Sequence, residues 1–309
     1  MLCAEPSSRS AKAAPALDDL LRAWGLRRTP FVVDDKTADL FLTDIHRESL
    51  DLLDTTAALR GVMVLTGTPG TGKSTLLKNW LSGLEPKRFL PLLITQSSLS
   101  ATGVLEVLLA KLGERARFKR STNLLLLEKH LADLEPVTLV LALDDAQNYP
   151  GPALEELRML LGIGGRHRSA FALILLGDYL LGRLRLSVQR ALFSRISATA
   201  KLGNLPREAI PAYLNWHVSR AGLDRDIFAP AALDMLAEAS EGNPRTLGLL
   251  AQAAWLDAAR NNSLTIDAEY MHKALHKSLP PASKSKTPEN PAGCARGPHG
   301  PPARPASLY

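Results

Sequence analysis

Eight residues from Gly67 to Ser74 read Gly-Thr-Pro-Gly-Thr-Gly-Lys-Ser and fit the pattern G-x-x-x-x-G-K-[ST]. Glycines in such a loop allow several backbone N–H groups to converge on phosphate oxygens. Lys73 would reach the β- and γ-phosphates of a nucleotide, and the Ser74 hydroxyl would hold Mg²⁺. The pattern therefore predicts an ATP-binding loop, with contacts from Gly67, Thr68, Pro69, Gly70, Thr71, Gly72, Lys73, Ser74 and Thr75.

A second chemical group follows the apolar run Leu139–Leu143, where Asp144 and Asp145 stand side by side. A buried strand that ends in carboxylates brings them to the sheet edge where ligands bind. We expect Asp144 to be the acid on the Mg²⁺ side and Asp145 to orient or deprotonate the attacking water. An Asp pair that only opens a turn is the alternative, and the phosphate-binding loop earlier in the chain favours the metal site.

The surrounding pattern predicts the elements that position these groups. Apolar strands are expected at 62–66, 89–95, 137–143, 170–176 and 197–202, alternating with helices at 44–59, 73–84, 104–112, 121–134 and 153–161. Alternation of strands and helices predicts a three-layer α/β domain with a parallel sheet. From Pro206 onward the pattern is helical only, which predicts a small all-α bundle, or lid.

The expected organisation is a disordered tail at 1–16, an N-terminal helix with the α/β domain at 17–203, the helical lid at 204–279, and a disordered Pro-rich tail at 280–309. The net charge of +6 is compatible with a nucleic-acid partner without establishing one. Its two cysteines lie in the terminal segments and suggest no disulfide framework. Without an apolar run long enough for a membrane span or a visible secretory signal, a cytoplasmic protein without a membrane partner is expected.

Several spaced blocks together resemble one family. They are Gly67–Ser74, Asp144-Asp145-Ala146-Gln147, Leu157–Leu161, Leu175-Leu176-Gly177-Asp178, Ser194-Arg195-Ile196 and Gly242-Asn243-Pro244-Arg245. Their order is similar to that of AAA+ ATPases of the ExeA/TniB/IstB/TnsC type, over roughly residues 20–278. The resemblance implies a P-loop AAA+ domain followed by a helical lid. In that family the acidic block usually reads Asp-Glu-Ala-Gln, so the shorter Asp145 leaves the rate of hydrolysis open.

The resemblance also implies roles for two arginines. Arg195 matches the block that supplies an arginine finger to a neighbouring subunit, where it would neutralise charge on the transferred phosphoryl group. Arg190 is the second candidate for this finger, and Arg195 is preferred. Arg245 matches the arginine that senses nucleotide from the lid. For both, a surface arginine that packs its stem on apolar neighbours is the alternative. An arginine finger in trans predicts a homo-oligomer, as a ring or a filament.

We therefore expect an ATPase that assembles on double-stranded DNA and assists a DDE-type transposase in target selection. The DNA and transposase partners are implied by the resemblance. Two alternatives are a secretion-assembly ATPase like ExeA and a nucleotide-gated switch with little turnover. The basic stretches 115–120 and 166–168 could follow DNA phosphates, although solvated loops explain them equally well.

Overall fold

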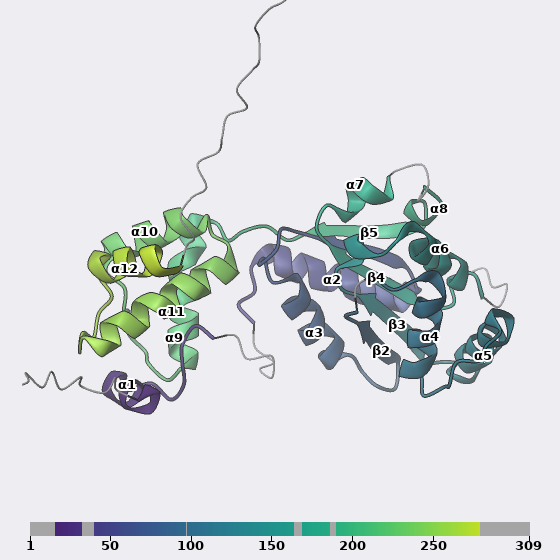
Figure 1. The fold of residues 1–309 in the computed structure, drawn as a ribbon, viewed down its shortest axis with the longest axis horizontal. Helices are drawn as coiled ribbons and strands as arrows, with labels where there is room; N and C mark the ends of the chain where they lie inside the picture. The colour runs from purple at the N-terminus through teal and green to yellow at the C-terminus, as the bar shows by residue number, and fades with distance from the viewer. Residues whose placement is uncertain (1–15, 33–39, 97, 164–168, 186–189, 279–309) are drawn as a thin grey trace, which may run out of the picture.

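The computed structural model describes residues 16–32, 40–96, 98–163, 169–185 and 190–278. Figure 1 shows a sheet with flanking helices at one end of the molecule and a group of helices at the other. The two expected tails lie outside the described residues, apart from Ala16, and so does the basic stretch 166–168.

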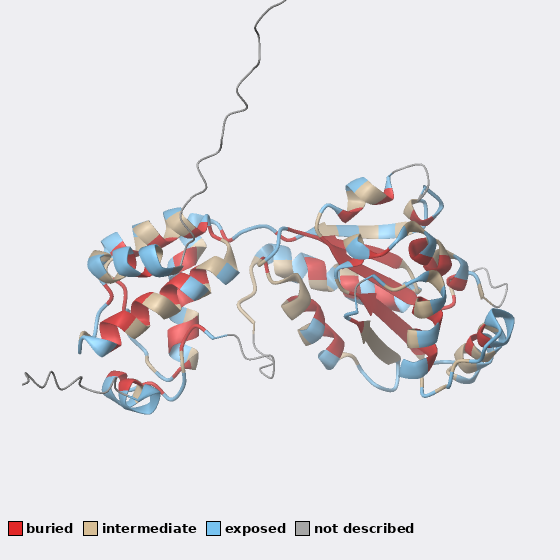
Figure 2. Ribbon diagram, in the orientation of Figure 1, coloured by how far each residue is buried: buried red, intermediate tan, exposed pale blue. Residues whose placement is uncertain are grey.

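A five-stranded parallel sheet, in the order β2-β3-β4-β1-β5, forms the centre of the α/β part. Its strands are β1 (Val62–Thr66), β2 (Phe89–Ile94), β3 (Thr138–Leu143), β4 (Ala172–Gly177) and β5 (Ile196–Lys201). Strands β1, β3 and β4 are buried along their whole length, while β2 and β5 at the edges are only partly covered (Figure 2). Burial on both faces of the sheet explains the continuous apolar runs of β1, β3 and β4.

Alternate residues of the central strands face two separate cores. On β1, Val62 and Val64 join one core, and Met63 and Leu65 join the other, as a side-chain period of two requires. Helices α2 (Asp44–Leu59) and α3 (Lys73–Gly83) contribute to the core of Met63 and Leu65. The opposite core receives α4 (Ala101–Lys111), α5 (Arg120–Asp133), α6 (Gly151–Leu160), α7 (Leu180–Leu184) and α8 (Arg190–Phe193). The result is the predicted three-layer arrangement.

The C-terminal helical region has a core of its own. Its helices are α9 (Ile210–Arg220), α10 (Pro230–Ser240), α11 (Pro244–Arg260) and α12 (Ala268–Ser278). Helix α1 (Leu17–Trp24) also belongs to this core, because Trp24 packs edge-on against Trp255 of α11 at 6.2 Å between ring centroids. The sequence predicts this N-terminal helix as part of the α/β domain, but the structure packs it against the helical region.

One local prediction was wrong. The helix expected at 121–134 was predicted to begin at Ser121, but α5 begins at Arg120 and its N-cap residue is Lys119, whose side chain accepts no capping hydrogen bond. At this first residue of α5, the Arg120 guanidinium donates twice to the buried Glu156 carboxylate at 2.8 and 3.0 Å.

Candidate nucleotide-binding site

The glycine-rich loop connects the last residue of β1 to the first residue of α3, as predicted. Helix α3 begins at Lys73 directly after Gly72, so its N-terminal end faces the loop. A helix N-terminus carries free N–H groups and partial positive charge, which favour a bound anion. Since β1, β3 and β4 are parallel, their carboxyl ends bring Gly67, Asp144 and Asp178 to one edge of the sheet.

Lys73 carries the positive charge of the phosphate-binding loop. Its ammonium group donates to the carbonyl oxygens of Gly67 at 2.6 Å and Thr68 at 3.1 Å. The pKa of Lys73 is lowered from its ordinary value, and the largest cause is the partial burial of its ammonium group. The ammonium is therefore held inside the loop, where it can meet phosphate oxygens.

Four charged side chains lie close enough to Lys73 to influence it electrostatically. Asp178, Asp144 and Asp145 act to raise the pKa of Lys73, and Arg245 acts to lower it. Asp144 and Asp145 come from the end of β3, Asp178 from the end of β4, and Arg245 from the helical region. The structure therefore gathers the predicted acids and the predicted lid arginine around one lysine.

The acidic segment has a defined local geometry. A carboxylate oxygen of Asp144 accepts a hydrogen bond from the backbone N–H of Asp145 at 3.0 Å. Asp145 is exposed and adopts the left-handed conformation, with φ +51°. Its Oδ1 accepts a hydrogen bond from the side-chain amide of Gln147 at 3.1 Å. The turn thus holds the two carboxylates in different environments.

A direct contact joins the loop to helix α11. The backbone N–H of Arg245 donates to the Gly70 carbonyl at 3.2 Å, and the Asn243 amide donates to the Pro69 carbonyl at 2.9 Å. Asn243 also caps α11 by accepting from the N–H groups of Arg245 and Thr246. Gly70 has φ +93°, and a Cβ there would lie 2.4 Å from Asn243 Oδ1. Only glycine therefore allows this approach.

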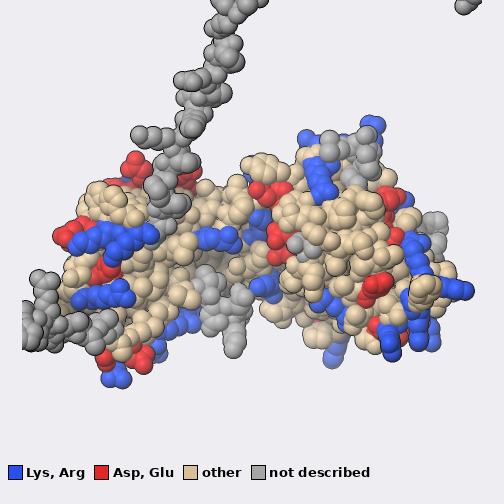
Figure 3. All heavy atoms as spheres, in the orientation of Figure 1, with Lys and Arg blue, Asp and Glu red and all other residues tan. Residues whose placement is uncertain are grey.

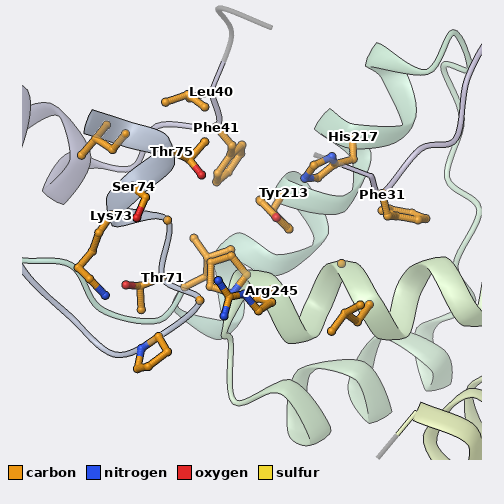
Figure 4. Close-up of a pocket in the computed structure, with 18 of the residues that line it drawn as sticks. Phe31, Leu40, Phe41, Thr71, Lys73, Ser74, Thr75, Tyr213, His217 and Arg245 are labelled. Carbon is orange, nitrogen blue, oxygen red and sulfur yellow. The ribbon is translucent and has the colours of Figure 1, made fainter. Parts of the chain in front are cut away.

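These groups line a cavity of about 700 Å³ between the α/β part and the helical region. Figure 4 shows Thr71, Lys73 and Ser74 at one end, aromatic residues including His217 and Phe31 at the other, and Arg245 between them. Pro69 to Thr75, Asp144, Asp145 and Arg245 all line the cavity. Gly67 and Thr68 are not among the lining residues, and their carbonyl oxygens accept hydrogen bonds from Lys73.

The aromatic wall of the cavity was not anticipated from the sequence. On α9, Tyr213 and Trp216 pack edge-on against His217 at 4.6 and 4.7 Å between ring centroids, and Phe41 packs edge-on against Tyr213 at 5.5 Å. Burial lowers the pKa of His217 to about 4, against a hydrogen bond to the Pro30 backbone that favours the protonated ring. The sequence signal for this wall was the i, i+3, i+4 spacing of Tyr213, Trp216 and His217, which places them on one face of α9.

Arg195 lies away from this cavity. It directly precedes β5, whose first residue Ile196 pairs with Val62 at the start of β1, whereas the phosphate-binding loop follows the end of β1. The exposed guanidinium donates to the Arg158 carbonyl at 3.2 Å. Arg195 and the phosphate-binding loop are therefore at opposite ends of parallel strands.

The residue chemistry of the cavity fits Mg²⁺ together with a nucleotide. Ser74 and Asp144 offer a hydroxyl and a carboxylate to the same space, and Mg²⁺ prefers such oxygen ligands beside phosphate groups. Among the described residues, no three His, Cys, Asp or Glu side chains form a metal-binding cluster. A Mg²⁺ ion here would therefore depend on phosphate oxygens for its remaining ligands.

Comparison with known proteins agrees with this architecture. Residues 57–184 match the family model described as an AAA domain. The overall structure is similar to Cdc6p from Pyrobaculum aerophilum, with a TM-score of 0.61 at 22% identity, covering 80% of this chain and 72% of that chain. The chain has the AAA+ fold.

Two further solved structures share this AAA+ fold. An ORC2 protein from Aeropyrum pernix, described in ADPNP-ADP complexes, has a TM-score of 0.60 at 17% identity and covers 81% of this chain and 71% of that chain. The RuvB Holliday junction branch migration motor of Thermotoga maritima has a TM-score of 0.52 at 18% identity, covering 79% and 72%. At these identities the likeness concerns the fold.

One curated relative shows a longer sequence match. General secretion pathway protein A from Aeromonas hydrophila is 27% identical over 263 residues, which cover 82% of this chain and 46% of the relative. The chain thus spans about half the length of this relative. In the part of the chain that the structure describes, no helix is long and apolar enough to cross a membrane.

Proposed function

We propose that the protein binds ATP with Mg²⁺ in the cavity between the α/β part and the helical region, and hydrolyses it. One observation carries this proposal: Asp144, Asp145, Asp178 and Arg245 line the same cavity as Lys73, next to the carboxyl edge of the sheet. Lys73 would bind the β- and γ-phosphates, and Ser74 and Asp144 would hold the metal. When bound, Mg²⁺ would neutralise charge on the phosphate oxygens.

Asp145 is proposed to orient the attacking water and accept its proton. Gln147 donates to Oδ1 of Asp145, and no other described side chain donates to this carboxylate. The remaining oxygen, Oδ2, is therefore free to accept a hydrogen bond from water. Arg245 reaches the same cavity from the start of α11 and would report the presence of the phosphates to the helical region.

Arg195 is proposed to complete the site of a neighbouring protomer. It cannot act on the cavity of its own chain, because it lies at the opposite end of the strands. An exposed guanidinium in this place fits an arginine finger in trans, which implies a ring or filament that forms with ATP. Sedimentation with a non-hydrolysable ATP analogue should show this assembly, and monomers alone would contradict it.

Double-stranded DNA is the proposed partner, and the loop before α5 supports it. Arg115, Arg117 and Lys119 are exposed, and none forms an ion pair with another described residue. Figure 3 shows Lys and Arg side chains gathered at the end of the molecule where α5 lies. Arg120 is different, because Glu156 neutralises it. Three cations free to meet phosphates are typical of a surface that contacts DNA.

The basic loop is also held in place, with an aromatic residue at its tip. The buried Asn123 side chain accepts from the Arg117 N–H at 2.6 Å and donates to the Arg117 carbonyl at 3.0 Å. Phe118, the next residue, is fully exposed. If this loop contacts DNA, replacing Arg115, Arg117 and Lys119 by Ala should flatten the salt dependence of DNA binding. An unchanged slope would exclude the loop.

The finer proposal is that this cytoplasmic ATPase assists a DDE-type transposase in target selection on DNA. It rests on the resemblance of the spaced sequence blocks and on the basic loop. The second candidate is a role in secretion assembly, which the match to General secretion pathway protein A favours. A nucleotide-gated switch with slow turnover is the third, which the short Asp145 side chain favours.

Steady-state ATP hydrolysis with and without duplex DNA separates these candidates. Stimulation by DNA is the result expected for the transposition helper. Turnover that ignores DNA would favour secretion assembly, and tight ATP binding with negligible turnover in both conditions would favour the switch. Absence of ATP binding would refute the proposal as a whole.

A further inference from the structure

Gln147 connects the acidic segment to the end of the neighbouring strand. It lies in a short 3₁₀ turn (Ala146–Asn148) directly after the Asp pair, and its side chain is partly buried. Its side-chain N–H donates to Asp145 Oδ1 at 3.1 Å, and its side-chain oxygen accepts from the backbone N–H of Asp178 at 3.3 Å. One amide therefore bridges residues that follow β3 and β4.

The two partners determine which way the amide points. The carboxylate of Asp145 can only accept, and the backbone N–H of Asp178 can only donate. A flipped amide would place its oxygen against the carboxylate and its NH₂ group against the N–H, which makes both contacts repulsive. An amide is the side chain that satisfies a carboxylate and an N–H at once, whereas a carboxylate or an apolar group at position 147 satisfies at most one of them.

The surroundings of Gln147 hold it in this place. A Cβ on Gly177 would lie 2.5 Å from the Gln147 side-chain oxygen, so only glycine at the end of β4 leaves room for the amide. The Arg183 guanidinium donates to the backbone carbonyl oxygens of Gln147 and Tyr149. Tyr149 is buried, and its hydroxyl donates to the Gln96 carbonyl beyond the end of β2 at 2.6 Å. Contacts at Gly177, Arg183 and Tyr149 thus hold the turn in place.

We propose that Gln147 is a positioning residue for ATP hydrolysis, which holds the Asp145 carboxylate by Oδ1 and leaves Oδ2 for the attacking water. The inference rests on the proposed role of Asp145. Since the Asp145 side chain is short and exposed, a fixed hydrogen bond limits its rotation. The same amide ties this orientation to Asp178, whose side chain lines the cavity beside Lys73.

The first test replaces the amide and separates binding from turnover. Gln147→Leu and Gln147→Glu both remove the donor to Asp145, and each should lower kcat by about 10- to 100-fold, the cost of a misplaced catalytic group. The affinity for a non-hydrolysable ATP analogue should stay within about twofold, because Gln147 does not hold phosphate in this proposal. Asn148→Ala is the matched control, since it removes a neighbouring exposed amide and should leave kcat unchanged.

A double-mutant cycle provides a readout that a merely structural role would not move. If Gln147 acts through Asp145, adding Gln147→Leu to Asp145→Asn should cause little further loss of kcat. Full additivity of the two losses would overturn the proposal, as would wild-type kcat in Gln147→Leu or a parallel loss of analogue binding. Wild-type kcat in Asp145→Asn alone would instead refute the proposed role of Asp145. Thermal unfolding of each variant identifies any that fail to fold.

Discussion

At the residue scale, the proposed hydrolysis depends on Asp145, an aspartate in the left-handed conformation. Asp145→Asn should keep ATP affinity near the wild-type value and lower kcat by about 100-fold or more, because a positioned general base contributes roughly 10²–10⁴ in rate. Single-turnover hydrolysis and analogue binding measure the two effects. Equal kcat in the variant and the wild type would mean that another group activates the water.

A second residue-scale prediction concerns pH and His217. The pKa of His217 is about 4 in the folded protein, against 6.5 for the ordinary side chain. Between these values the unfolded chain binds more protons, so stability must fall as the pH drops from 6.5 toward 4. From pH 7.5 to 5.5 this residue alone should remove about 1.4 kcal/mol from the free energy of unfolding.

Urea unfolding of the wild type and His217→Gln at the two pH values measures this contribution. The variant should lose about 1.4 kcal/mol less between pH 7.5 and 5.5, whatever its stability at pH 7.5. The exposed His272→Gln is the control and should follow the wild type. An identical loss in His217→Gln and the wild type would show that His217 does not remain neutral when folded.

At the element scale, the contact between the phosphate-binding loop and α11 is set by Gly70. Gly70→Ala would place a Cβ 2.4 Å from Asn243 Oδ1 and 2.9 Å from Arg245 Cβ, at a φ of +93°. We expect a loss of about 1–3 kcal/mol in stability and weaker ATP binding, because loop and helix must separate. Gly83→Ala, where nothing lies within 4 Å, should be neutral or slightly stabilising. Unaltered ATP affinity in Gly70→Ala would contradict the expectation that ATP binding depends on this contact.

The strands and helices also indicate how much of the fold sequence patterns can predict. The three central strands, and the sheet edge that carries the loop and Asp144, could be predicted from unbroken apolar runs, because strands that are buried along their whole length leave such a signal. The start of α5 did not follow, because its N-cap residue Lys119 makes no side-chain capping hydrogen bond and so leaves no local signal. Packing of α1 on Trp255 is likewise a long-range contact without a local signal.

In the candidate site too, local motifs could be predicted from the sequence and long-range contacts could not. The phosphate-binding loop and the Asp pair are contiguous motifs, so the sequence predicted where they would meet. The aromatic wall combines Phe41 with Tyr213, Trp216 and His217 of α9, which meet only when the helical region folds back on the α/β part. Gln147 was visible in the acidic block, but its two partners depend on how β3 and β4 lie together.

At the scale of the whole molecule, the position of Arg195 predicts shared active sites. Lys73→Ala and Arg195→Ala should each hydrolyse ATP poorly alone. An equimolar mixture should recover about a quarter of wild-type activity, because in a random assembly one site in four combines an intact Lys73 with an intact neighbouring Arg195. Arg190→Ala is the control and should remain active alone. Assembled mixtures without any recovery would exclude an arginine finger in trans.

The most direct test of the central claim is the affinity for Mg²⁺-ATP, measured by calorimetric titration of the wild type, Lys73→Ala and Lys78→Ala. Lys78 is an exposed lysine of the same helix that does not line the cavity. We predict that the wild type and Lys78→Ala bind alike and that Lys73→Ala binds at least about 100-fold more weakly, roughly 3 kcal/mol for a lost charge-assisted contact. Equal affinity in Lys73→Ala, or no binding by the wild type, would contradict the account.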